Sequence, residues 1–98
     1  MGIMKLTATA EQTVRTLYFK IDQGPTFEAE GVQRQVVGCS VTWKGAKDWS
    51  EGTPSYRIVY QRLKKDGSFY AGGSQSWQWL VPAEVLHEVV EAVAVWES

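Results

Sequence analysis

The sequence predicts an α+β fold in which an antiparallel sheet of four to five strands is followed by one C-terminal helix packed on one face. Apolar residues recur at helical spacing only near the C-terminus, whereas earlier stretches alternate apolar and polar residues with a period of two. The connections between these stretches are short, which favours antiparallel neighbours. With 98 residues, the chain is expected to form a single domain over residues 1–98.

The first two strands are expected at residues 3–10 and 13–21. Only Glu11 and Gln12 clearly separate them, so a short hairpin and one bent strand are both open. Residues 22–32 hold Gly24, Pro25 and Gly31 and are predicted to form a loop.

The third strand is expected at residues 35–44, where Gly38 in mid-strand indicates a bulge or the close approach of another backbone. The residues of this strand expected to face inward are Val37, Cys39, Val41 and Trp43. The fourth strand is expected at residues 55–63 and ends in an Asp66-Gly67 turn. A fifth strand, interrupted at two glycines, is expected at residues 69–71 and 76–80.

The only stretch with a helical pattern lies within residues 77–96. Pro82 suits a first helical turn, and Glu84 places a carboxylate at the positive end of the helix dipole. The expected apolar stripe consists of Val85, Leu86, Val89, Val90, Val93 and Trp96. Each valine costs about 0.6 kcal/mol relative to alanine in a helix, so this helix is expected to form only when docked.

Composition argues against several classes of function. No run of about 18 apolar residues is present, so no membrane association is expected, and a cytoplasmic location is the default. A single cysteine, Cys39, forbids an internal disulfide, and no cofactor or metal is expected. The only histidine, His87, lies on the helix without a catalytic partner. The chain is therefore predicted not to be an enzyme.

Charge is unevenly distributed although the net charge is only −1. Residues 31–66 carry seven Lys and Arg side chains and three acidic ones, whereas residues 67–98 carry four glutamates and neither Lys nor Arg. Two solvated surfaces are one interpretation. The other is a basic binding face backed by an acidic helix.

Five tryptophans are more than one small core can hold. Trp43 and Trp96 lie on predicted apolar faces, and Trp49 lies in a polar loop beside Lys47. Trp77 and Trp79 share one face, and whether that face is core or binding platform stays open. Aromatic rings and cations interleaved on a sheet are what unpaired bases require, because rings stack on bases while cations contact phosphates. Tyr and Arg are also common on any half-exposed strand.

One resemblance to a known family is carried by the segments VTWKG (residues 41–45) and PSYRI (residues 54–58). A Lys-Lys-Asp-Gly turn, a glycine-rich stretch and an amphipathic helix follow them. Over residues 35–96 this order resembles the positive-cofactor-four family, which are single-stranded-DNA-binding transcriptional coactivators. The chain departs from the family pattern at Arg57-Ile58-Val59, and its glycine-rich stretch lacks a lysine.

The resemblance implies a curved antiparallel sheet with one helix, and a homodimer that grips an unpaired strand. By this resemblance Trp43, Lys44, Tyr56, Arg57 and Tyr60 would lie near the strand-binding surface, with Lys64 and Lys65 at its rim. The full set of expected binding residues is Trp43, Lys44, Lys47, Trp49, Tyr56, Arg57, Tyr60, Arg62, Lys64 and Lys65.

The predicted function is thus a non-catalytic module that binds single-stranded nucleic acid. The alternative is a small protein-interaction domain, such as an inhibitor or adaptor of the kind that phages encode. That alternative rests on the acidic pI of about 5.8 and on the surplus of tryptophan, which favours interface hot spots.

Overall fold

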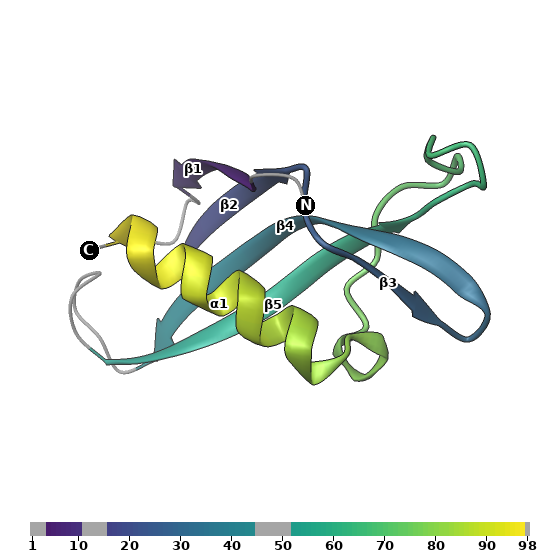
Figure 1. Ribbon diagram of the computed structural model, residues 1–98. Coiled ribbons are helices and arrows are strands. Elements are labelled where there is room, and N and C mark those ends of the chain that lie inside the picture. The colour runs from purple at the N-terminus through teal and green to yellow at the C-terminus, as the bar shows by residue number, and fades with distance from the viewer. Residues whose placement is uncertain (1–3, 11–15, 45–51, 98) are drawn as a thin grey trace.

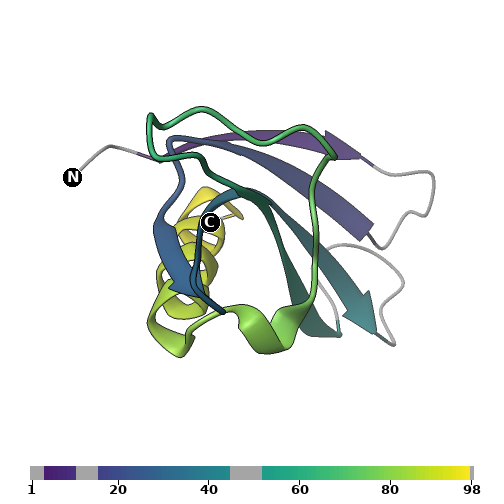
Figure 2. The same ribbon diagram turned by 90° about the vertical axis from the view of Figure 1, so that its right-hand side faces the viewer.

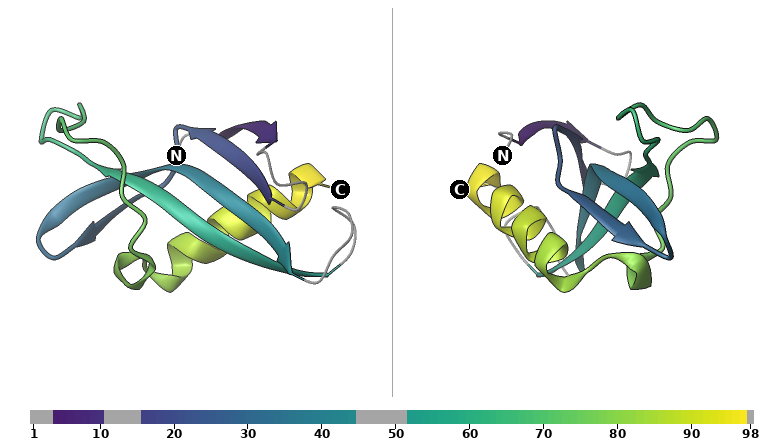
Figure 3. Two further views of the ribbon diagram at one scale, coloured as in Figure 1. Left: turned by 180° about the vertical axis from the view of Figure 1, so that it is seen from behind. Right: turned by 45° about the vertical axis from the view of Figure 1, so that its right-hand side comes forward.

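The computed structural model describes residues 4–10, 16–44 and 52–97. Their elements, in chain order, are β1 (Lys5–Ala10), β2 (Thr16–Asp22), β3 (Thr26–Ala29), β4 (Val32–Lys44), β5 (Thr53–Arg62), a one-turn 3₁₀ helix (Gln78–Leu80) and α1 (Ala83–Glu97). The helix crosses one face of the sheet (Figure 1). In the view from the opposite side, the sheet lies in front of the helix (Figure 3, left). This confirms the predicted antiparallel sheet followed by one C-terminal helix.

The sheet is antiparallel at every pairing between described strands. β5 runs along one edge of β4, and β2 and β3 occupy the opposite edge one after the other. β1 pairs antiparallel with β2 from Lys5↔Asp22 to Ala10↔Leu17, so these are two paired strands and not one bent strand. The sheet is strongly curved, as the view along the strands shows (Figure 2).

The predicted loop at residues 22–32 contains a strand, β3, and this expectation was wrong. Glu30 and Gly31 both have positive φ, at 53° and 76°, which is the backbone of a tight two-residue hairpin turn. That turn pairs Ala29 with Val32 and extends β4 back to residue 32. Gly24 marks the break between β2 and β3, where its backbone lies so close to the carbonyl of Val36 that a side chain would collide with it.

β4 contains the irregularity that Gly38 indicated, because its register with β5 shifts between Val36 and Gly38. The bulge exchanges the two faces at that point. Val36 is fully buried under α1, whereas Val37 is half-buried on the other face. The expectation that Val37 faces inward was therefore wrong, and the prediction for Cys39, Val41 and Trp43 is confirmed.

No fifth strand forms at residues 69–71 and 76–80 as expected. The chain instead returns along the free edge of β5 with two isolated bridges, Leu63↔Phe69 and Tyr60↔Gln75, and then enters the 3₁₀ turn. The glycines at 72 and 73 have φ of 121° and 82°, which excludes a regular strand there.

The core lies between α1 and the inner face of the sheet. From α1, Val85, Val89 and Val93 are buried against residues of β2, β4 and β5. Pro82 directly precedes α1, and its carbonyl oxygen accepts bonds from the N–H groups of Val85 and Leu86, each at 3.1 Å. Two members of the predicted stripe are corrected: Leu86 is exposed, and Trp96 is half exposed while its ring packs edge-on against Phe19.

Candidate nucleic-acid interface

Tyr56 and Arg57, a ring and a cation expected together on β5, lie on opposite faces of the sheet. Tyr56, Ile58 and Tyr60 face α1, whereas Arg57 projects from the outer face, by which we mean the face turned away from α1. Successive strand residues point to opposite sides, so a tyrosine and its neighbouring arginine cannot share a surface here. Tyr56 is half-buried against the core.

Two residues expected in the binding surface are core residues instead. Trp43 is 6% exposed and Tyr60 is 0% exposed, so neither ring can stack on a ligand. The Tyr60 hydroxyl donates to the carbonyl oxygen of Trp77 at 3.1 Å, and its ring meets Phe27 edge-on. Burial raises the pKa of Tyr60 by removing water from the phenolate form.

Arg34, which sequence reasoning counted only as a charge, is buried with them. Its Nη1 donates to the carbonyl oxygens of Ala29 and Val32, and its guanidinium lies 5.9 Å from the centre of the Tyr60 ring. This arginine therefore stabilises the β3–β4 turn and is withdrawn from the basic surface.

The hairpin tip, residues 63–70, gathers cations around a tyrosine. The Arg62 guanidinium lies 5.4 Å and the Lys64 Nζ 5.6 Å from the centre of the Tyr70 ring. All three side chains are exposed, as is Lys65. The Tyr70 N–H donates to the Arg62 carbonyl oxygen at 3.1 Å, so the hairpin ladder itself sets the distance between ring and cation.

The turn of this hairpin is fixed by Asp66. Its Oδ1 accepts from the Ser68 N–H at 2.9 Å and from the Ser68 hydroxyl at 2.6 Å. These hydrogen bonds from Ser68 lower the pKa of the Asp66 carboxyl. The turn therefore keeps its geometry, with Lys64 and Lys65 presented together, throughout the neutral range.

Trp77 and Trp79 form an exposed pair that we call the tryptophan platform. Their ring centroids are 5.6 Å apart and the rings are nearly parallel, at 8°. Trp77 is 52% exposed and Trp79 is 76% exposed, which resolves the open alternative in favour of a surface position.

Gln78, between the two tryptophans, holds this platform on the edge of β5. Its Oε1 accepts from the Ile58 N–H at 2.9 Å, and its Nε2 donates to the Ile58 carbonyl oxygen at 2.8 Å. The side-chain amide thus takes the place of a backbone partner beside β5. Two residues nearer the hairpin tip along β5, Gln75 and Tyr60 exchange both backbone bonds at 2.8 and 2.9 Å.

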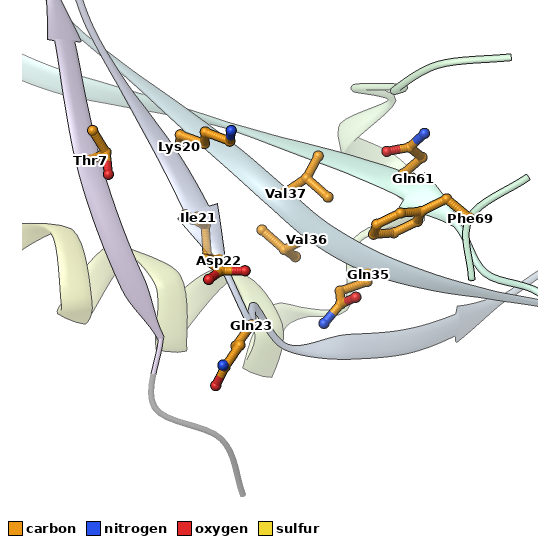
Figure 4. A pocket seen from close by; sticks show the side chains of 10 residues that line it. All are labelled: Thr7, Lys20, Ile21, Asp22, Gln23, Gln35, Val36, Val37, Gln61 and Phe69. Carbon is orange, nitrogen blue, oxygen red and sulfur yellow. The ribbon is translucent and has the colours of Figure 1, made fainter. Parts of the chain in front are cut away.

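A groove of about 570 Å³ lies on the outer face (Figure 4). Its lining comes from β1, β2, β4, β5, the hairpin tip and the residue after β2. The polar lining residues are Thr7, Lys20, Asp22, Gln23, Gln35 and Gln61, and the apolar ones are Ile21, Val36, Val37 and Phe69.

Beside the groove, Gly38 makes room for the Tyr18 side chain on the outer face. A Cβ at residue 38 would lie 2.0 Å from the Tyr18 hydroxyl oxygen and 2.6 Å from Cζ. Lys20 and Arg57 add two exposed cations to this face. The outer face is thus polar and cationic.

The helix presents the opposite charge. Glu84, Glu88 and Glu91 are exposed on α1, and His87 Nε2 lies 2.9 Å from Glu91 Oε1. Within the described ranges, no group of three or more His, Cys, Asp or Glu residues is placed to hold a metal ion. No helix in the described part of the chain is long and apolar enough to cross a membrane.

Sequence reasoning missed several residues of this surface. Phe69 and Tyr70 were assigned to a broken strand, yet folding the chain at the Asp66-Gly67 turn places them opposite Leu63 and Arg62. Lys20 was visible as an outward residue of its strand. Of the other expected residues, Lys44 ends β4, and Lys47 and Trp49 lie outside the described residues.

Comparisons of the chain with protein-family models, with curated proteins and with solved structures give no match.

Proposed function

We propose that this chain is a non-catalytic module that binds single-stranded nucleic acid. The observation that carries the proposal is the segment after β5: residues 69–79 present four exposed aromatic rings, those of Phe69, Tyr70, Trp77 and Trp79, beside exposed cations. Rings stack on unpaired bases of any sequence, and cations contact the phosphates between them. The resemblance to single-stranded-DNA-binding coactivators points the same way.

The arrangement along β5 supports a linear ligand. Arg62 and the neighbouring Tyr70 lie at the end of β5 that leads into the hairpin tip. Ile58, which bonds Gln78 between the two tryptophans of the platform, lies four residues earlier on β5. At about 3.4 Å per residue, Tyr70 and the tryptophan platform are therefore about 14 Å apart along β5. An extended strand of a few nucleotides covers such a distance, whereas a compact ligand does not.

The test is a titration of an unpaired DNA 20-mer at several salt concentrations, followed by tryptophan fluorescence. We expect a micromolar or lower Kd at low salt and a steep loss of affinity as salt rises. In the double variant Arg62→Gln/Lys64→Gln, two phosphate contacts are removed, so the slope of log K against log salt should fall by about 1.4 for a single strand.

The matched control is Ala94→Glu/Val95→Glu, which changes the net charge equally but at exposed positions near the C-terminal end of α1. Above 0.1 M salt it should leave the slope unchanged, because the Debye length is then about 10 Å or less. If no quenching occurs at low salt with tens of micromolar protein, the proposal is wrong. Light scattering on the same samples tests the expected homodimer.

A second candidate function is protein interaction, favoured by the tryptophan platform itself. Exposed tryptophans are frequent hot spots at interfaces. Trp79 and Val95 are both 76% exposed, so Trp79→Ala and Val95→Ala remove apolar side chains that are equally accessible. A stoichiometric protein partner that is lost in the first variant and kept in the second would support this function. If the chain binds oligonucleotides and captures no protein partner, the protein-interaction function is excluded.

A further inference from the structure

The groove on the outer face has the chemistry of a site for one planar, polar-edged ligand. Its volume of about 570 Å³ falls within the range of small-molecule sites and leaves room for a base with its sugar. Val37 supplies an apolar floor, and Phe69, exposed at the rim, supplies a ring (Figure 4). Flat apolar surface of this kind suits the face of a nucleobase.

The polar groups in the groove still have hydrogen-bonding capacity. Gln35 donates its Nε2 to the Gly24 carbonyl oxygen at 2.9 Å, which leaves its Oε1 as an acceptor. Among the described residues, neither Lys20 nor Asp22 has an ion-pair partner within 4.0 Å, although the two side chains are neighbours on the same face of β2. A ligand can therefore contact both charges.

Asp22 determines which ligand edge fits. An ionised carboxylate only accepts hydrogen bonds, so it favours a ligand that offers N–H donors and repels one that offers oxygen acceptors. Cytosine and adenine present an exocyclic amino group, whereas thymine presents a carbonyl oxygen in the corresponding place. Lys20 is placed to meet the phosphate of the same nucleotide.

We propose that this groove holds one unpaired base bearing an exocyclic amino group and discriminates against thymine through Asp22. The inference rests on the proposed function and adds a sequence preference to it. Phe69 stacks on the base, Asp22 accepts from its amino group, and Lys20 neutralises its phosphate. The hairpin tip and the tryptophan platform contact the rest of the strand without distinguishing bases.

The experiment compares a cytosine 12-mer with a thymine 12-mer at pH 7.5 and 0.1 M salt. The wild-type chain should bind the cytosine oligomer about tenfold more tightly, as one charge-assisted hydrogen bond provides. In Asp22→Asn the carboxamide can donate to the thymine carbonyl, so the ratio of the two affinities should fall to about one. Phe69→Ala should weaken both oligomers without changing the ratio.

Asp66→Asn is the matched control, because it removes the same charge from the hairpin tip and keeps an oxygen for the Ser68 bonds. It should change both affinities together and preserve the ratio. Equal wild-type affinities, or an unchanged ratio in Asp22→Asn, would overturn this inference and leave the proposed function standing. If neither oligomer binds, both the inference and the proposed function are wrong.

Discussion

Tyr60 was expected from the sequence to bind a ligand, but in the fold it is a core residue. Flanked by Val59 and Gln61 and close to Arg62, it has the local context of a surface ring. It is fully buried because the period-two alternation of β5 places it under α1, and its hydroxyl is satisfied by Trp77. Sequence reasoning could not separate the two roles, since the partner that buries the polar atom comes seventeen positions later in the chain.

The raised pKa of Tyr60 predicts a specific loss of stability in alkaline solution. Because the folded-state pKa lies above the unfolded value of about 10, the stabilisation is fully present below pH 10 and is lost as pH rises through the folded-state pKa. Tyr60→Phe should cost about 1 kcal/mol at neutral pH through the lost hydrogen bond and should flatten the alkaline decline. Urea unfolding at pH 8–11, with tyrosinate absorbance, measures both. An equally steep decline in Tyr60→Phe would contradict the assignment.

Two glycines allow a second prediction at the residue scale. A Cβ at Gly24 would lie 2.2 Å from the Val36 carbonyl oxygen, which is backbone, whereas the nearest atom to a Cβ at Gly38 is the movable hydroxyl of Tyr18. Gly24→Ala should therefore destabilise the fold by about 3 kcal/mol, and Gly38→Ala by about 1 kcal/mol, in chemical denaturation. The reverse order would show that β2 and β3 adjust more easily than Tyr18.

At the scale of elements, period-two and helical spacing predicted four strands and the helix, because each of these buries one face. β3 escaped prediction because its four residues, Thr26–Ala29, are too few to display a period, and it was enclosed by Gly24 and Gly31. The inward residues of β4 were predicted correctly only after the bulge, from Cys39 onward. Before the bulge the prediction fails, because one inserted residue exchanges the two faces of the strand.

The edge of β5 was the other feature hidden from the sequence. A strand was expected over residues 76–80, yet a glutamine side chain bonds Ile58 where a strand backbone would have done so. Local propensity carries no signal for such a substitution. Trp77 and Trp79 flank this glutamine, and their rings stack on the surface with centroids 5.6 Å apart.

Gln78 supports a prediction at this scale. Gln78→Leu keeps the volume but leaves the Ile58 N–H and carbonyl without this partner, so it should cost about 2–3 kcal/mol. It should also weaken the exciton band of the stacked tryptophans in near-ultraviolet circular dichroism. Gln75→Leu is the matched comparison, because the bonds of Gln75 to Tyr60 are made by its backbone and survive the change. A Gln78→Leu variant with full stability and an intact exciton band would show that the amide does not hold the platform.

At the scale of the whole molecule, charge is divided between two sides of an elongated body. The extents of the chain are 44 × 24 × 23 Å, and the acidic helix covers the inner side of the sheet while Lys20, Arg57 and the hairpin tip lie elsewhere. The sequence already indicates this uneven charge, because residues 31–66 are basic and residues 67–98 are acidic. The acidic side of the molecule was predictable because the helix had to cover the apolar face of the sheet. The division of the cations between the outer face and the hairpin tip follows from strand alternation in β2 and β5 and from the turn at Asp66-Gly67.

This division makes the effect of the helix on a bound strand depend on salt. At about 20 Å in water, a carboxylate and a phosphate repel each other by about 0.2 kcal/mol before screening. With a Debye length of about 30 Å at 0.01 M salt, three helix charges acting on about four phosphates oppose binding by about 1 kcal/mol. At 0.15 M, where the Debye length is about 8 Å, this repulsion is almost fully screened.

The triple variant Glu84→Gln/Glu88→Gln/Glu91→Gln should therefore bind an unpaired oligonucleotide several-fold more tightly than wild type at 0.01 M salt and equally at 0.15 M. Fluorescence titrations at both salt concentrations measure this, and circular dichroism checks that α1 persists without the His87–Glu91 pair. An affinity gain that persists at 0.15 M would mean that the strand passes within contact distance of the helix. The bound strand would then lie closer to Glu84, in the first turn of α1, than the separation of about 20 Å used for this estimate.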